Sequence, residues 1–99
     1  MRVGIEIKPL SAGRYSYNDL IDTLRVQLVG QYLRDIRSRH GILVLFLLEP
    51  RSFEPEPGVR IGFPELLRRL SEEARNIEAS HGYIKRVVVV GIECTVQAT

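Results

Sequence analysis

Apolar and polar residues alternate at the start of the chain, which predicts a strand. The alternation covers six residues, Val3-Gly4-Ile5-Glu6-Ile7-Lys8. A period of two is typical of a strand with one buried and one polar face. We therefore expect the three aliphatic residues to face a core and Glu6 and Lys8 to share the other face. Pro9 ends the regular pairing.

The next pattern has helical spacing and predicts a helix from about Asn18 to Arg39. Asn18 suits the N-cap, and His40-Gly41 supplies a stop. Gly30 interrupts the middle of this helix, where glycine is less favourable than alanine by about 1 kcal/mol. The apolar positions that recur at this spacing are Leu20, Ile21, Leu24, Leu28, Tyr32 and Ile36.

Two continuous apolar runs predict two further strands. Residues 42–48 and 87–92 are uniformly apolar apart from Gly91, a composition typical of parallel strands covered on both faces. Between them, Glu49 to Gly62 is rich in proline and predicts a long loop.

A second helix is expected to begin around Pro64, which fits a first helical turn, and to end at His81-Gly82. The residues of its apolar stripe are Leu66, Leu67, Leu70, Ala74 and Ile77.

The predicted order is β-α-β-α-β, which indicates an α/β fold with three mainly parallel strands and two helices. With 99 residues, 44% of them hydrophobic and 26% charged, residues 1–99 are expected to form a single domain. The formal net charge of +2 permits contact with nucleic acid without requiring it. Cys94 is the sole cysteine in the sequence, which excludes an internal disulfide. No apolar run is long enough to span a membrane and no signal peptide is evident, so a cytoplasmic protein is expected.

Glu6 and Lys8 are the candidate catalytic residues. Two positions apart on a strand, they project from the same face. A carboxylate there can bind Mg²⁺ or Mn²⁺, and a neighbouring ammonium can stabilise charge on a phosphate. The spacing alone is more typical of a solvent-facing strand with a cross-strand charge pair.

The segment "VGIEIKPL", followed by "DLIDTLRVQLVGQYLRDIRSRHGILVLFLL", resembles the PD-(D/E)xK superfamily of restriction endonuclease-like nucleases. More narrowly, it resembles a nuclease-like module at the C-terminus of large bacterial multidomain proteins. The resemblance implies a metal-dependent nuclease with Glu6 as a metal ligand and Lys8 assisting the attacking water. It also implies that Gln27 positions the substrate, with Gln31 as a competing choice and Tyr32 nearby.

The arginines near the end of the first predicted helix offer a contact to nucleic acid. Arg34, with Arg37 and Arg39, is a candidate for touching the phosphate backbone. The alternative is a solvated helix end in which the cations favour the helix dipole.

Members of the superfamily place a further acidic residue on a strand before the Glu-x-Lys strand, and this sequence holds no such residue ahead of Glu6. The resemblance therefore implies a partial restriction endonuclease-like core, and we expect catalysis to be impaired or absent in this chain alone. The first strand is also expected to present an open edge. The alternative function is a non-catalytic interaction module that forms a homo-oligomer, or completes a larger chain, by pairing along that edge.

Overall fold

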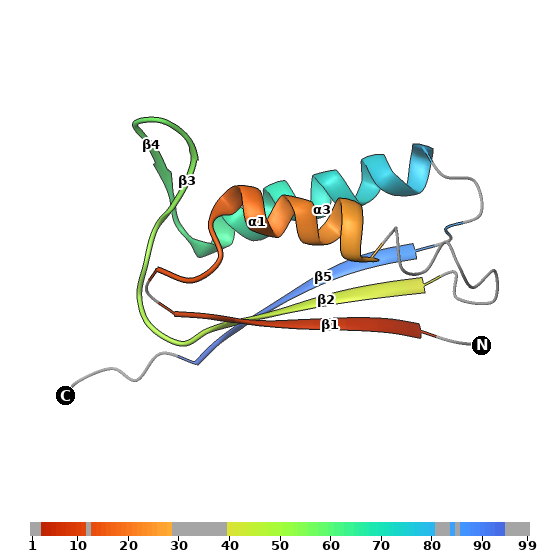
Figure 1. Ribbon diagram of the computed structural model, residues 1–99, viewed down its shortest axis with the longest axis horizontal. Helices are drawn as coiled ribbons and strands as arrows, with labels where there is room; N and C mark the ends of the chain where they lie inside the picture. The colour runs from red at the N-terminus through yellow and green to blue at the C-terminus, as the bar shows by residue number, and fades with distance from the viewer. Residues whose placement is uncertain (1–2, 12, 29–39, 81–83, 85, 95–99) are drawn as a thin grey trace.

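A three-stranded parallel sheet forms one layer of the molecule, and helices lie against one side of it (Figure 1). The computed structural model describes residues 3–11, 13–28, 40–80, 84 and 86–94. The strands are β1 (Val3–Leu10), β2 (His40–Leu47) and β5 (Arg86–Glu93), in the order β1-β2-β5. The register places Ile7, Val44 and Val90 side by side. The predicted α/β class, with three parallel strands and β1 at an edge, is confirmed.

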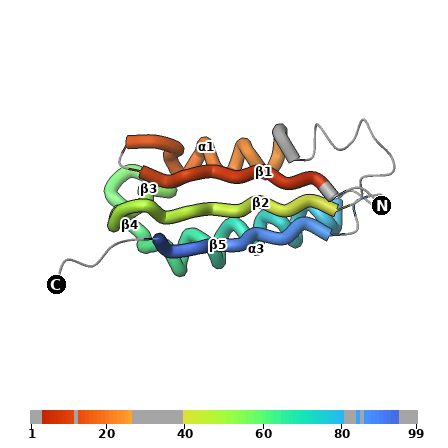
Figure 2. Tube along the Cα trace, turned by 90° about the horizontal axis from the view of Figure 1, so that it is seen from below, coloured from red at the N-terminus to blue at the C-terminus, as the bar shows by residue number. Residues whose placement is uncertain are grey.

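Helices cover one face of this sheet. α1 (Tyr17–Asp22) continues directly into η1 (Thr23–Leu28), and α3 (Phe63–Ser80) lies beside them on the same side. Figure 2 shows the sheet from the opposite side, where the strands lie in front of the helices. The first predicted helix is therefore confirmed for residues 18–28, and its remainder, including Gly30, falls outside the described residues.

The N-cap of α1 is Ser16, and the expectation that Asn18 holds this position is wrong. The Ser16 hydroxyl accepts a hydrogen bond from the Asp19 N–H at 3.2 Å, and the Asp19 carboxylate accepts one from the Ser16 N–H at 2.8 Å. This reciprocal pair is a capping box, which satisfies two otherwise unpaired N–H groups. One turn later, the Thr23 hydroxyl donates to the Asp19 carbonyl at 2.9 Å, where the helix widens into the π-type turns of η1.

The core lies between the helices and the sheet. Most of its fully buried members are leucines of β1, β2 and the helices. These leucines are Leu10, Leu20, Leu24, Leu43, Leu45, Leu66 and Leu70. Pro64 lies in the first turn of α3, as predicted. Of the predicted stripe, Leu67 is only half-buried, and Phe63 joins the core in addition.

Gly91 allows α3 to approach β5 closely. A Cβ placed on Gly91 would lie 2.4 Å from Cδ1 and 3.0 Å from Cγ of Leu67. Because no real Cβ tolerates such contacts, the glycine makes room for the Leu67 side chain.

The segment predicted as a loop contains a hairpin. β3 (Phe53–Glu56) and β4 (Val59–Ile61) pair antiparallel, so the expectation of an unstructured Glu49–Gly62 is wrong. Pro57 and Gly58 form the connection, and Gly58 has a φ of 82°, which suits proline followed by glycine in a type II turn.

One of the two predicted helix stops, His40-Gly41, needs correction. His40 and Gly41 belong to β2, where they pair with Val3 and Gly4, and do not stop a helix. Both residues adopt the extended backbone of a strand because they pair in parallel register with the start of β1. His81-Gly82 falls outside the described residues.

The faces of β1 are reversed relative to the prediction. Ile5 and Ile7 are each 56% exposed, whereas Glu6 and Lys8 lie half-buried on the face that carries the buried Leu10. The reversal arises because helices cover the sheet on the Glu6 side. β2 likewise alternates between buried and half-buried residues, so the expected burial of 42–48 on both faces is wrong for the described structure.

Candidate functional site

The two predicted catalytic residues, Glu6 and Lys8, project from the same face of β1. They are level with Leu43 and Leu45 of β2, and the adjoining helical segment is η1. Both side chains are half-buried. Since β1 is an edge strand, the two side chains lie at the margin of the core and not at its centre. The expected projection of Glu6 and Lys8 from one face of β1 is thus present.

Tyr15 positions the lysine. The Lys8 Nζ lies 5.0 Å from the centroid of the Tyr15 ring, within the range of a cation–π contact. Tyr15 has a φ of 60°, a left-handed backbone conformation that is uncommon for an aromatic residue. Strained residues of this kind persist where surrounding contacts hold them.

Arg51 supplies those contacts. Its guanidinium donates to the carbonyl of Ser11 at 2.8 Å, to that of Tyr15 at 3.2 Å, and to that of Arg14. It also lies 4.3 Å from the centroid of the Phe53 ring. Burial lowers the pKa of the Arg51 guanidinium, and the nearby Glu49 partly opposes that shift. The arginine therefore joins the β1–α1 connection to the hairpin, and residue spacing gave no signal of it.

A divalent cation would find one carboxylate here. Mg²⁺ keeps several waters and commonly uses one or two carboxylates together with substrate phosphate oxygens. Glu6 suits one such position, and no hydrogen bond or ion pair to another described residue occupies its carboxylate. Within residues 3–11, 13–28, 40–80, 84 and 86–94, no three His, Cys, Asp or Glu side chains cluster in a way that could hold a metal. Further oxygen ligands would come from water, from substrate, from residues outside the described part of the chain, or from another polypeptide.

The remaining predicted site residues lie at or beyond the limit of the described structure. Gln27 lies in η1, whose backbone passes over the sheet, but its side chain is not described. Gln31, Tyr32 and Arg34 lie outside the described residues, as do Arg37 and Arg39. Their roles remain predictions.

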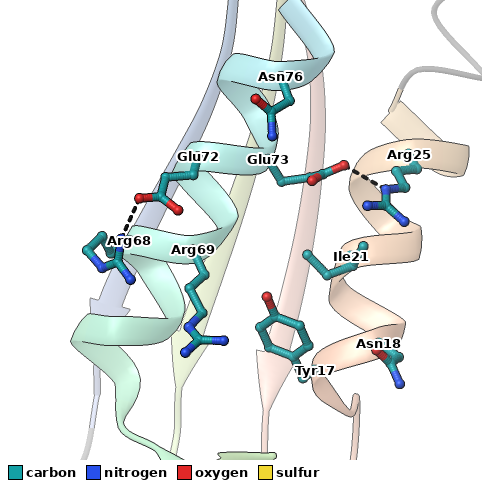
Figure 3. A pocket seen from close by; sticks show the side chains of 9 residues that line it. All are labelled: Tyr17, Asn18, Ile21, Arg25, Arg68, Arg69, Glu72, Glu73 and Asn76. Carbon is teal, nitrogen blue, oxygen red and sulfur yellow. Dashed lines mark hydrogen bonds and ion pairs between the residues drawn. The ribbon is translucent and has the colours of Figure 1, made fainter. Parts of the chain in front are cut away.

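A polar groove of about 380 Å³ lies between the helices on the solvent side (Figure 3). Three arginines line it, and each is paired with a glutamate. Arg25 of η1 binds Glu73 of α3 at 2.6 Å, which raises the pKa of Arg25. The other ion pairs are those of Arg68 with Glu65 and Glu72, and of Arg69 with Glu65. Charge in the groove is thus compensated internally, which disfavours it as an anion site.

Glu65 accepts hydrogen bonds from two of these arginines. Hydrogen bonds from Arg68 and Arg69 lower the pKa of the Glu65 carboxyl from 4.5 to about 2. The carboxylate also lies in the first turn of α3, where a negative charge is favourable. These ion pairs stabilise the helix layer and do not mark a catalytic group.

The second candidate site is the sheet face opposite the helices, hereafter the open face. No helix or strand covers it in the part of the chain that the structure describes. By register its residues are Ile5, Ile7 and Pro9 of β1, Ile42, Val44 and Phe46 of β2, and Val88, Val90 and Ile92 of β5. All nine are apolar, and Leu48 extends the same row beyond β2, with 46% of its surface exposed. Exposed apolar patches of this extent mark interaction sites in soluble proteins.

The two edges of the sheet differ in how open they are. The Leu48 N–H donates to the Leu10 carbonyl at 3.0 Å, so the main-chain groups of Leu10 point towards β2. Because this direction alternates along a strand, the N–H and carbonyl groups of Ile5 and Ile7 point away from β2, to the open edge. At the other edge, Glu78 and Arg75 of α3 bond the N–H and carbonyl of Val87 at 3.3 and 2.6 Å. β1 therefore offers the more accessible edge, and Pro9, which lacks an N–H, limits it.

No protein-family model matches the sequence, and no curated protein or solved structure is significantly similar to it. None of the described helices is both long and apolar enough to cross a membrane. Function is therefore inferred from the geometry of the described residues and the resemblance of the Glu6–Lys8 segment.

Proposed function

We propose that this chain contributes Glu6 and Lys8 to a nuclease-type site that hydrolyses phosphodiesters with Mg²⁺ or Mn²⁺. The observation that carries the proposal is the projection of both side chains from one face of an edge strand. Nucleic acid is the corresponding substrate, and the net charge of +2 is compatible with it. The fold class and the Glu-x-Lys segment both support this proposal.

The chemistry assigns a separate task to each residue. Glu6 would hold the cation, which supplies charge stabilisation and a more acidic bound water. Lys8, oriented by the Tyr15 ring, would assist the attacking water and stabilise charge on the phosphate. The water would attack phosphorus and lose a proton to solvent, the ester P–O bond would break, and the departing oxygen would take a proton from solvent. A second carboxylate from another polypeptide segment would complete the metal site, so hydrolysis by this chain alone is expected to be slow.

A cleavage assay with labelled DNA and RNA in excess protein and Mn²⁺ tests the proposal. We expect slow cleavage that Glu6→Gln and Lys8→Met each reduce by about 100-fold. Glu56→Gln is the matched control, because Glu56 is an exposed carboxylate in β3. Metal-dependent cleavage that is indifferent to Glu6→Gln, or no cleavage by the wild type, would contradict the proposal.

A second candidate function is a non-catalytic interaction module that pairs through the β1 edge. The outward main-chain groups of Ile5 and Ile7 favour it, because an added strand could bond them. Ile7→Pro removes one of the N–H groups. Light scattering over a concentration series should then show a dimer in the wild type and a monomer in Ile7→Pro, and a wild-type monomer throughout would rule this candidate out.

A further inference from the structure

The open face is unusual for a sheet of this type. Parallel sheets occur almost always with both faces covered by helices. Here α1, η1 and α3 cover one face, and the central residues of the other are exposed, Ile7 by 56% and Val90 by 38%. The face is therefore a surface that another polypeptide can cover.

The area of the open face sets the size of the interface. Three strands of eight residues give a face about 14 Å wide and 26 Å long, or about 400 Å². A partner that touches this face alone would bury about 800 Å² in total, which is below the 1,200 Å² or more of stable interfaces and typical of transient complexes. We therefore expect the occupant to bind weakly, and area does not distinguish a second copy from another polypeptide.

Charge distinguishes the two kinds of occupant. Among the described residues, the polar side chains at the amino end of the open face are His40 and Arg86, which are register partners on β2 and β5. Arg86 is exposed. The nine residues of the open face carry no acidic group, so a second copy stacked on it would bring no carboxylate from that face to Arg86. A partner with acidic residues at one end complements the face better.

The length of the strands matches that of a helix. Strands of about 26 Å match a helix of about 18 residues. On the covered face the chain uses a helix of that size, since α3 has 18 residues and packs along β5. A helix on the other side would complete the three-layer arrangement that parallel strands favour.

We propose that the open face binds an amphipathic α-helix of another polypeptide. That helix would carry a leucine- or isoleucine-rich stripe and acidic residues at the end lying over His40 and Arg86. This inference rests on the fold and not on the nuclease proposal, because Glu6 and Lys8 lie on the opposite face of β1.

The test uses the full chain and two fluorescent peptides, each with a leucine stripe and the 18-residue length of α3. One peptide carries glutamates in a terminal turn, and the other carries lysines there. Anisotropy should show tighter binding of the glutamate peptide, and Arg86→Gln should remove the difference between them. Ile7→Thr should weaken binding by about tenfold. Val26→Thr is the matched control, because Val26 is 64% exposed on η1, away from the open face.

Each remaining outcome counts against the proposal. Absence of binding by either peptide would overturn it, and so would binding that Ile7→Thr leaves unchanged. Light scattering on the same samples detects a second copy: a dimer that excludes the peptide and is lost in Ile7→Thr would replace the helix as occupant. Ile5→Thr serves as a second variant should Ile7→Thr fail to fold. Cleavage tested with Glu6→Gln is a separate measurement, so failure of one proposal leaves the other standing.

Discussion

Ile7 and Val44 are register partners on neighbouring parallel strands, and both present their side chains to the face that no described helix covers. One residue further along, Lys8 and Leu45 are partners on the covered face, where Leu45 is fully buried. β1 and β2 therefore separate two surfaces. One carries the candidate catalytic pair beneath the helices, and the other is an apolar face available to a partner.

This assignment of faces predicts unequal effects of substitution. Ile7→Thr removes an apolar side chain that is mostly in water, so we expect the free energy of unfolding to fall by about 0.5 kcal/mol or less. Leu45→Ala removes a fully buried side chain and should cost about 2–5 kcal/mol. Urea unfolding followed by circular dichroism measures both. A larger loss for Ile7→Thr than for Leu45→Ala would mean that the faces are assigned wrongly.

The contact between Gly91 and Leu67 predicts a steric effect. Gly91→Ala places a methyl group against Leu67 and should cost about 1–3 kcal/mol. In the Leu67→Ala background the clash is relieved, so the double variant should be more stable than the sum of the two single effects implies. Additive effects in this double-mutant cycle, measured by urea unfolding, would argue against the contact.

Arg51 should contribute measurably to stability and to the position of Tyr15. Arg51→Met removes hydrogen bonds to three loop carbonyls, and hydrogen bonds involving charged groups each contribute about 1.5–3 kcal/mol. We expect a loss of about that size, together with a change in the near-ultraviolet circular dichroism of tyrosine. Arg60→Met, an exposed arginine in β4, is the matched control. Equal stability of the two variants would contradict this role.

The lowered pKa of Glu65 predicts that the folded chain loses stability in acid. The pKa of this carboxyl is lower in the folded chain, about 2, than the ordinary value of 4.5, so the folded state favours the charged form. The resulting stability is fully present above pH 4.5 and is lost as the pH falls towards 2. Thermal unfolding of wild type and Glu65→Gln over that interval measures the effect. The difference between them should shrink as the pH falls, and a constant difference would show that Glu65 is not the group responsible.

The sequence was sufficient to predict the order of strands and helices because hydrophobic periodicity follows the backbone repeat. It was sufficient to place Glu6 beside Lys8 for the same reason. Periodicity predicted the wrong covered face of β1, because Glu6 and Lys8 are typical of a solvent-facing side, whereas the helices cover that side and leave Ile5 and Ile7 exposed. The hairpin was missed because Pro55 and Pro57 suggested a loop, although Pro57-Gly58 is itself a turn signal. The contacts of Arg51 join segments far apart in sequence, and no local pattern encodes them.

The claim that Glu6 holds a divalent cation is tested most directly by a Mn²⁺ titration followed by amide NMR. Mn²⁺ broadens the signals of nuclei near it, so even a weak site is located by residue. We expect the amides around Glu6 and Lys8 in β1 to broaden first, and Glu6→Gln to abolish this while Glu56→Gln does not. Broadening that appears elsewhere, or that persists at β1 in Glu6→Gln, would contradict the assignment of Glu6 as the metal ligand.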